Sequence, residues 1–208
     1  PTNTLSAFQS GQSSWGAKLD GSSVVQFDGV SRPYTAQTNN IKNFFRTGAT
    51  ATNTLALNKS FDGGSVRFSA SDLSNKAITP GSSLNRQSFN LSGNYNIDKH
   101  LTVDARVSYI LEQAKNRPFL SDGAGNSSYN VTLLPTSVDV LTLKKAVNDN
   151  GTEYAYSGNT FATNPWFAAE KFVNNTKRER ILSSINLRYN FDNGAFIQGR
   201  AGRDAYTD

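Results

Sequence analysis

Apolar and polar residues alternate with a period of two along residues 89–97 and again along residues 101–111. The even positions carry polar side chains, including Asp104 and Arg106. A helix would repeat its apolar residues every three or four positions, whereas a strand presents alternate residues to opposite faces. The pattern predicts strands 87–97 and 101–112, joined by the turn Asp98-Lys99-His100. The odd positions of this long hairpin form an apolar face that includes Phe89, Leu91, Tyr95, Val103, Val107 and Tyr109.

Two more hairpins follow from the same period. Strands 51–60 and 65–73 are expected on either side of Asp62-Gly63-Gly64. Strands 181–192 and 195–206 are expected on either side of Asn193-Gly194, which is the strongest short hairpin signal in the chain. Ile185 and Leu187 lie on the apolar parity of strand 181–192, and Arg188 lies on its polar parity. The expected fold class is therefore all-β, with six antiparallel strands.

The remaining stretches lack a sustained period. Residues 1–50 predict an aromatic-rich loop region with a short helix near residues 40–47. A medium loop is expected at residues 74–86 and a long one at residues 113–180. Within the long loop, Ser137–Val147 is compatible with a helix, because Val140, Leu143 and Val147 fall on one helical face.

Short turns thus alternate with longer loops, as they do in outer-membrane barrels. The predicted central hairpin carries no charge on its apolar parity, and neither does Ile181–Phe191. On this interpretation the apolar parity faces lipid, whereas Asp104, Arg106 and Arg188 face a polar lumen. Tyr95, Tyr109, Tyr189 and Phe191 then suggest an aromatic girdle, although strand propensity alone also explains them. A soluble antiparallel sandwich is the alternative, since it also alternates apolar and polar residues, but usually over shorter strands.

Composition narrows the function classes. The 208 residues include 16 glycines and no cysteine, so disulfides and thiol catalysis are excluded within the chain. No segment approaches the length of a membrane-spanning helix, so a membrane role would depend on strands. The net charge of +5 is modest and scattered, which argues against nucleic-acid binding. The single histidine, His100, lies in a predicted turn, and no catalytic residue, metal site or cofactor is expected.

Aromatic residues in the predicted loops are the candidate contact residues. Their rings are suited to stacking on sugar faces or peptide side chains, and their polar rims to hydrogen bonding. The alternative is that they fasten the loops to each other or to a partner protein. The candidates are Trp15, Tyr34, Tyr129, Tyr154, Tyr156, Trp166 and Phe167.

Several short motifs occur in a characteristic order. They begin with Ser14-Trp15-Gly16-Ala17-Lys18-Leu19-Asp20-Gly21 and Arg32-Pro33-Tyr34. They continue with residues 40–48 (NIKNFFRTG), Asn116-Arg117-Pro118 and Asn164-Pro165-Trp166-Phe167. This colinear set resembles the SusC/RagA family of TonB-dependent outer-membrane transporters, from about residue 14 to the end.

The resemblance implies a barrel of about 22 strands with a plug domain in its lumen. It also implies a SusD-like surface lipoprotein as partner, energy supplied through TonB, and import of oligosaccharides or peptides. Six strands cannot close such a barrel, so the chain is expected to be a portion of the barrel downstream of the plug, located in the bacterial outer membrane. The alternative function is an extracellular adhesin or carbohydrate-binding sandwich without transport.

Overall fold

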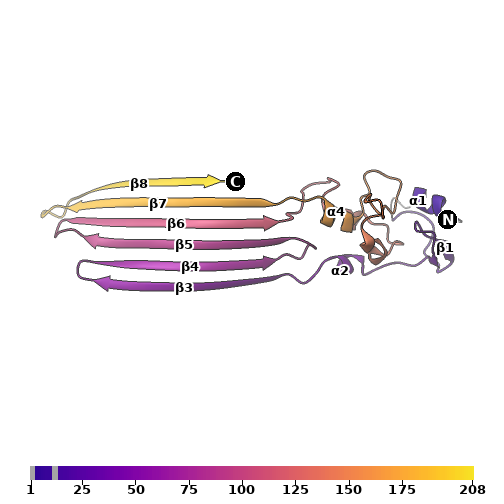
Figure 1. Ribbon diagram of the computed structural model, residues 1–208, viewed down its shortest axis with the longest axis horizontal. Coiled ribbons are helices and arrows are strands. Elements are labelled where there is room, and N and C mark those ends of the chain that lie inside the picture. The colour runs from indigo at the N-terminus through magenta and orange to yellow at the C-terminus, as the bar shows by residue number, and fades with distance from the viewer. Residues whose placement is uncertain (1–2, 11–13) are drawn as a thin grey trace. The chain divides into compact units, whose positions relative to one another are not determined.

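The protein is mostly β, with two antiparallel sheets, and the prediction of an antiparallel β fold is confirmed at this level (Figure 1). The computed structural model describes residues 3–10 and 14–208. The chain forms two compact units. The loop unit comprises Pro1–Ala49, Lys76–Ser83 and Lys115–Asn175, and the sheet unit comprises Thr50–Asn75, Leu84–Ala114 and Thr176–Asp208.

The sheet unit is built from six long strands in the order β3-β4-β5-β6-β7-β8. Each strand is hydrogen-bonded to its neighbours in the chain, and β3 and β8 are the two edges. Glycine permits the reversal between β3 and β4, because Gly63 has a φ of 78°. The bounds are β3 Ala49–Phe61, β4 Gly64–Lys76, β5 Ser83–Asn96, β6 Leu101–Lys115, β7 Thr176–Asn190 and β8 Phe196–Thr207.

The strands run further than the alternating pattern indicated. They contain 12 to 15 residues instead of about ten. The predicted loop over residues 74–86 was wrong at both ends, because β4 continues to Lys76 and β5 begins at Ser83. The backbone hydrogen bonds between neighbouring strands continue beyond the alternating apolar residues into polar segments, because these bonds do not depend on the type of side chain. For the same reason Tyr109 lies inside β6 and not near its end.

Register places the predicted apolar residues on one face of the sheet. Val103 of β6 lies opposite Leu187 of β7, and Ala105 lies opposite Ile185. In β5, Asn90 points to the other face, where its amide oxygen accepts a hydrogen bond from Ser108 (2.7 Å). Because successive residues alternate between faces, its neighbours Phe89 and Leu91 share the face of Val107 and Tyr109. We call this surface the apolar face.

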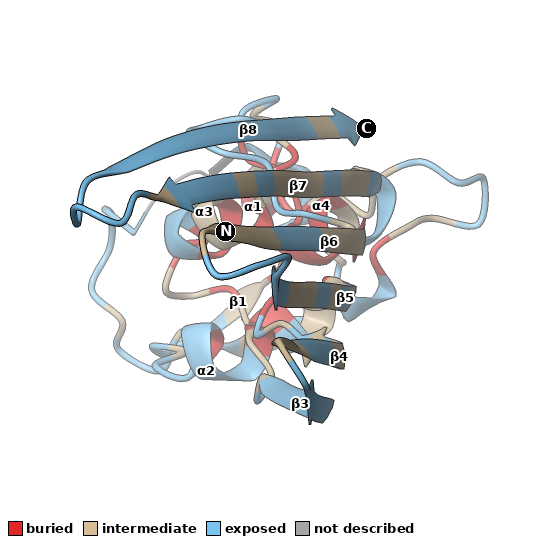
Figure 2. Ribbon diagram, turned by 90° about the vertical axis from the view of Figure 1, so that its left-hand side faces the viewer, coloured by how far each residue is buried: buried red, intermediate tan, exposed pale blue. Residues whose placement is uncertain are grey.

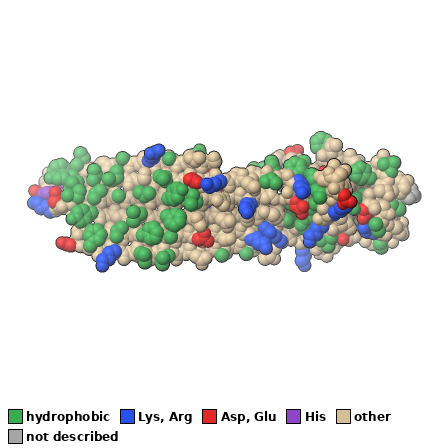
Figure 3. Space-filling model, viewed as in Figure 1, with side chains coloured by type: hydrophobic (Ala, Val, Ile, Leu, Met, Phe, Trp, Pro, Cys, Tyr) green, Lys and Arg blue, Asp and Glu red, His purple; other side chains and the backbone are tan. Residues whose placement is uncertain are grey.

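The apolar face is exposed within the sheet unit. Leu91, Ile185 and Leu187 keep 51%, 45% and 46% of their surface exposed. Figure 2 shows the strands in pale blue and tan, with little of the red that marks buried residues. In Figure 3, green hydrophobic side chains are spread over the sheet, with charged side chains mainly at its margins. In β8 the apolar face carries one charge, Arg203, which lies opposite Ser183.

The polar face is held together by side-chain hydrogen bonds that cross from strand to strand. Asn90 contacts Ser69 of β4 (3.4 Å) as well as Ser108 of β6. Arg86 of β5 binds Glu112 of β6 with both Nε and Nη2. Asn186 of β7 donates to Asp104 of β6 (3.1 Å). These contacts hold the register of the strands, because a shift of one residue would turn the polar side chains of a strand to the other face.

The loop unit contains the buried core of the described chain, around Phe44, Val140, Leu143 and Tyr156. Its helices are short, which explains why periodicity alone did not reveal most of them. The expected helix over Ser137–Val147 is a 3₁₀ helix, η1, over Val140–Lys145. The elements are α1 Thr4–Ser10, β1 Ser23–Val25, β2 Ser31–Pro33, α2 Asn40–Phe44, α3 Ser127–Leu133, η1 and α4 Pro165–Lys171.

Candidate functional site

Asn164 organises the core of the loop unit. Its side chain is fully buried, and its Oδ1 caps α4 by accepting a hydrogen bond from the backbone N–H of Trp166 (2.9 Å). Its Nδ2 donates to the carbonyl oxygens of Leu143 and Tyr154, both at 2.9 Å. Pro165 occupies the first helical turn, where its missing N–H costs nothing. The sequence Asn-Pro-Trp therefore starts α4 and joins it to two other segments.

Asn164 is expected to be essential for the stability of the loop unit. Asn164→Ala would remove the helix cap and leave the carbonyl oxygen of Tyr154 without its donor, whereas the carbonyl oxygen of Leu143 would keep the N–H of Ala146. Loss of the cap costs about 1 kcal/mol and the orphaned carbonyl about 1–3 kcal/mol, so the free energy of unfolding of this unit should fall by about 2–4 kcal/mol. Urea titration of the full-length protein, read by hydrogen exchange at α4, measures the change. Asn150→Ala, at an exposed turn, is the control; an equal loss in both variants would contradict the assignment.

Asn40 makes a similar buried bridge at the start of α2. Its Nδ2 donates to the carbonyl oxygen of Val138 (2.7 Å), and its Oδ1 accepts the N–H of Val140 (3.0 Å). Phe44, on the same helix, packs edge-on against Trp166 with ring centroids 5.0 Å apart. The segment around residue 40 is thereby fixed to the segment around residue 140.

The hairpin of β1 and β2 forms one wall of a pocket, and an ion pair holds its turn. Arg32 binds both carboxylate oxygens of Asp28, at 2.7 and 2.6 Å. Chiefly because of these hydrogen bonds from Arg32, the pKa of Asp28 is lowered from its ordinary value. Gly29 turns the chain with a φ of 81°, a conformation that side chains with a Cβ rarely adopt. The pair therefore orients the residues that follow each strand, Gln26 and Tyr34.

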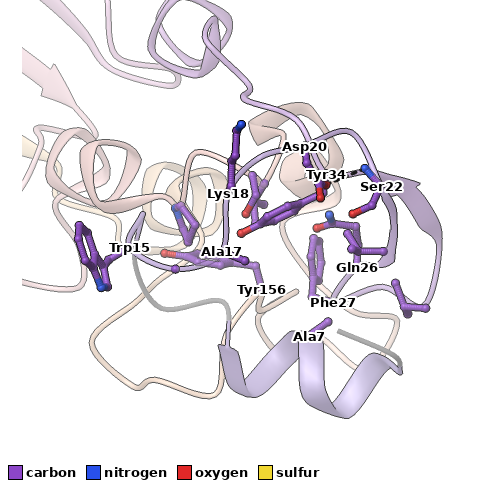
Figure 4. Close-up of a pocket in the computed structure, with 16 residues that line it drawn as sticks. Ala7, Trp15, Ala17, Lys18, Asp20, Ser22, Gln26, Phe27, Tyr34 and Tyr156 are labelled. Atoms are coloured by element: carbon purple, nitrogen blue, oxygen red, sulfur yellow. Dashed lines mark hydrogen bonds between the residues drawn. The ribbon is translucent and has the colours of Figure 1, made fainter.

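The pocket has a volume of about 300 Å³ and lies wholly within the loop unit. Tyr156 is 1% exposed and Gln26 is 9% exposed, and both line it. Tyr34 and Phe27 lie close to Gln26 in Figure 4, whereas Trp15 stands apart from them at the rim. Burial is the main reason that the pKa of Tyr156 rises to about 12, so its hydroxyl stays protonated at neutral pH.

The predicted aromatic candidates separate into three groups. Trp15, Tyr34 and Tyr156 line the pocket. Trp166 is buried in the core, where its indole N–H donates to the carbonyl oxygen of Val140 (2.9 Å), and Tyr154 and Phe167 pack against the same core. Tyr129 lies in α3 and does not line the pocket. Sequence reasoning missed Gln26 and Phe27; their position just after a short apolar strand was the available signal.

Glu153 is a half-buried carboxyl group beside the core. Its Oε1 accepts the backbone N–H of Asn164 (2.6 Å). Burial nevertheless raises its pKa above the ordinary value, and the hydrogen bond offsets only part of that rise. The folded state consequently holds a proton at pH values where the unfolded chain has already lost it.

This shift predicts a pH dependence of stability. Because the folded pKa lies above the unfolded one, Glu153 makes the fold less stable as pH rises from the unfolded pKa through the folded pKa. Glu153→Gln should therefore stabilise the loop unit more at pH 8 than at pH 4. The test is thermal unfolding of the full-length protein at both pH values, read by pulse hydrogen exchange at one labelling pH. A stabilisation that is equal at both values would contradict the raised pKa.

The three residues predicted to face a lumen lie on the polar face of the sheet. Asp104 and Arg106 line a hollow of about 180 Å³ together with Arg200 of β8 and Asn186 of β7. Arg188 lies over the ring of Phe196, with its guanidinium carbon 4.0 Å from the ring centroid. Asp104 and Arg106 thus share a small site on this face, and Arg188 contacts a separate group.

His100 lies in the turn between β5 and β6, where its Nδ1 is 2.8 Å from the carbonyl oxygen of Asn190. Within residues 3–10 and 14–208, His, Asp and Glu side chains form no group of three that would suit a metal ion. In the same residues, no helix has the length and apolarity needed to cross a membrane.

Comparison with known proteins gives no family assignment. The chain matches no protein-family model and no curated protein. Two surfaces of the chain bear on its function: the exposed apolar face of the sheet unit and the aromatic-lined pocket of the loop unit.

Proposed function

We propose that this chain forms part of the wall and outer loops of a SusC-like TonB-dependent importer in the bacterial outer membrane. The importer takes up oligosaccharides or peptides together with a SusD-like surface lipoprotein. The observation that carries the proposal is the apolar face, which is exposed on strands long enough to cross a bilayer. The order of the motifs between Ser14 and Phe167 supports the choice of family.

The dimensions of the apolar face fit a membrane. From Leu101 to Leu111 the odd positions of β6 carry no charge. Ten residue steps at about 3.4 Å span about 34 Å along the strand, which is about 26 Å along the membrane normal at a tilt of about 40°. Barrels of this class present an apolar band of about 25 Å. Lipid contact would therefore cover Phe89, Leu91, Tyr95, Val103, Val107, Tyr109, Ile185 and Leu187.

Arg203 has to be accommodated on the same face. It lies opposite Ser183, whose small side chain leaves room beside it. A long arginine side chain can extend along a surface and place its guanidinium group in a more polar layer. Near the start of β7, Glu179 accepts a hydrogen bond from Tyr109 (3.3 Å) and pairs with Lys177 (2.8 Å). We assign this end to the polar headgroup layer.

The two edges of the sheet fit a larger assembly. β3 and β8 each pair on one side only, so about every second residue along their 13 and 12 residues presents an unpaired backbone N–H and C=O. Long open edges are a hazard in a soluble protein, and closure into a barrel removes them. In a closed barrel of about 22 strands, the polar face with Asp104, Arg106 and Arg188 would form part of the lumen wall.

Cell fractionation of the full-length protein tests the location, and uptake tests the activity. The protein should appear in the outer-membrane fraction and require detergent for extraction. Loss of TonB should abolish uptake of its oligosaccharide or peptide, and a surface lipoprotein should co-purify with it. Recovery from the soluble fraction without detergent would instead support an extracellular adhesin or carbohydrate-binding sandwich.

A further inference from the structure

Two buried polar groups in the loop-unit pocket are available to a ligand. The hydroxyl of Tyr156 and the side-chain amide of Gln26 make no hydrogen bond within the described part of the chain, and no dashed line reaches either in Figure 4. In that same part, the polar side-chain atoms that are sealed from solvent without a partner are Oδ1 of Asn130 and Oδ1 of Asn186. Tyr156 and Gln26 both line the pocket with only 1% and 9% of their surfaces exposed, so we assign their unpaired polar ends to it.

The lining of the pocket combines these neutral polar groups with apolar surface. Phe27, Val24 and Val138 supply apolar walls, and the hydroxyl of Tyr34 adds a further neutral group. A sugar ring has a matching surface, because its C–H faces are apolar and each hydroxyl both donates and accepts hydrogen bonds. The amide of Gln26 can likewise donate and accept at once. The volume of about 300 Å³ is at the lower end for ligand pockets and suits one or two rings.

Charge and backbone geometry argue against an ionic ligand or an extended peptide. The charged residues of the lining, Lys18 and Asp20, are both exposed, so an ion in the buried part of the pocket would lie among neutral side chains. An extended peptide binds through a row of free backbone groups. Here two pairs of backbone groups beside the pocket bind each other: Tyr34 N–H donates to Ser22 O (2.8 Å), and Gly21 N–H donates to Tyr34 O (3.0 Å).

We infer that this pocket binds a single neutral saccharide unit, with Tyr156 and Gln26 hydrogen-bonded to its hydroxyls and Tyr34 and Phe27 against its ring. The inference rests on the proposed function for the source of the ligand, since the unit would belong to an imported glycan. It selects a neutral glycan over a peptide as the cargo. Trp15, 94% exposed at the rim, is placed to contact the adjoining unit of the chain.

Ligand-observed NMR on the detergent-solubilised full-length protein tests the inference. The probes are glucose, galactose, mannose, xylose and N-acetylglucosamine, with trialanine as the peptide competitor. We expect saturation transfer to at least one sugar. In Tyr156→Phe and in Gln26→Leu the affinity for that sugar should fall about fivefold or more, which corresponds to the loss of one hydrogen bond. Tyr129→Phe, which removes a hydroxyl away from the pocket, should bind as the wild type does.

The outcomes separate the pocket from the transport proposal. Binding of no sugar, equal affinity in Tyr156→Phe and Tyr129→Phe, or displacement of the bound sugar by trialanine would each overturn the saccharide site. If TonB-dependent uptake persists in that case, the importer proposal stands. If instead sugar binding depends on Tyr156 but uptake does not depend on TonB, the site stands and the importer proposal fails. Hydrogen exchange at α4 shows whether each variant keeps the fold.

Discussion

Leu91→Lys is expected to reduce strongly the amount of folded full-length protein in the outer membrane. Leu91 lies near the middle of β5 on the apolar face and is 51% exposed. A lysine facing lipid at mid-depth costs about 2–4 kcal/mol, because the ammonium group loses its water. Heat-modifiable migration of the outer-membrane fraction in gel electrophoresis measures how much protein is folded.

Ser92→Lys is the matched control, because the adjacent residue of a strand points to the opposite face. Its ammonium group would lie on the polar face, so assembly should be nearly unchanged. Equal damage from both substitutions would contradict the assignment of faces. A soluble sandwich would also tolerate Leu91→Lys poorly, so a second measurement is needed. A spin label at Leu91→Cys should be reached by lipid-soluble oxygen and not by a water-soluble nickel complex.

Trp166→Ala is expected to destabilise the loop unit by about 3–5 kcal/mol, the range for removing a large buried aromatic side chain. Trp166 is 8% exposed and contacts Phe44, and Lys144 lies over its ring with Nζ 5.6 Å from the centroid. The substitution would also leave the carbonyl oxygen of Val140 without its indole donor. Urea titration of the full-length protein, read by hydrogen exchange at α4, reports the loss.

Trp15→Ala provides the contrast, since the second tryptophan of the chain is 94% exposed. Its removal should change the stability of the loop unit by no more than about 0.5 kcal/mol. Trp166→Phe, which keeps most of the ring packing but loses the N–H, should fall between the two. A similar loss of stability from Trp15→Ala and Trp166→Ala would show that the rim residue is structural as well.

The long strands were predictable because their signal is local. Alternation over ten residues, ended by Asp62-Gly63 or Asn193-Gly194, needs no information about distant contacts. The same signal could not find the strand ends, since β4 and β5 extend through polar sequence to Lys76 and from Ser83. There the backbone ladder, and not the side-chain pattern, maintains the strand.

The short elements of the loop unit were not predictable in the same way. Helices of five to seven residues are marginal by themselves, and tertiary contacts stabilise them. A short helix was expected near residues 40–47, but Asn39, the N-cap of α2, makes no side-chain capping bond. Its neighbour Asn40 instead binds Val138 and Val140, about one hundred positions further along the chain. No local pattern contains that partner.

The sequence by itself determined the β class, the antiparallel hairpins and the parity of each strand, because a period of two is written in neighbouring residues. Only the tertiary structure decided what the loop aromatics do. Tyr156 and Trp166 both belong to the buried core, but Tyr156 also lines the pocket and Trp166 does not. The physical reason is that burial depends on segments that meet only after folding. The pocket itself exists only where β1, β2 and the residues near 135 and 156 come together.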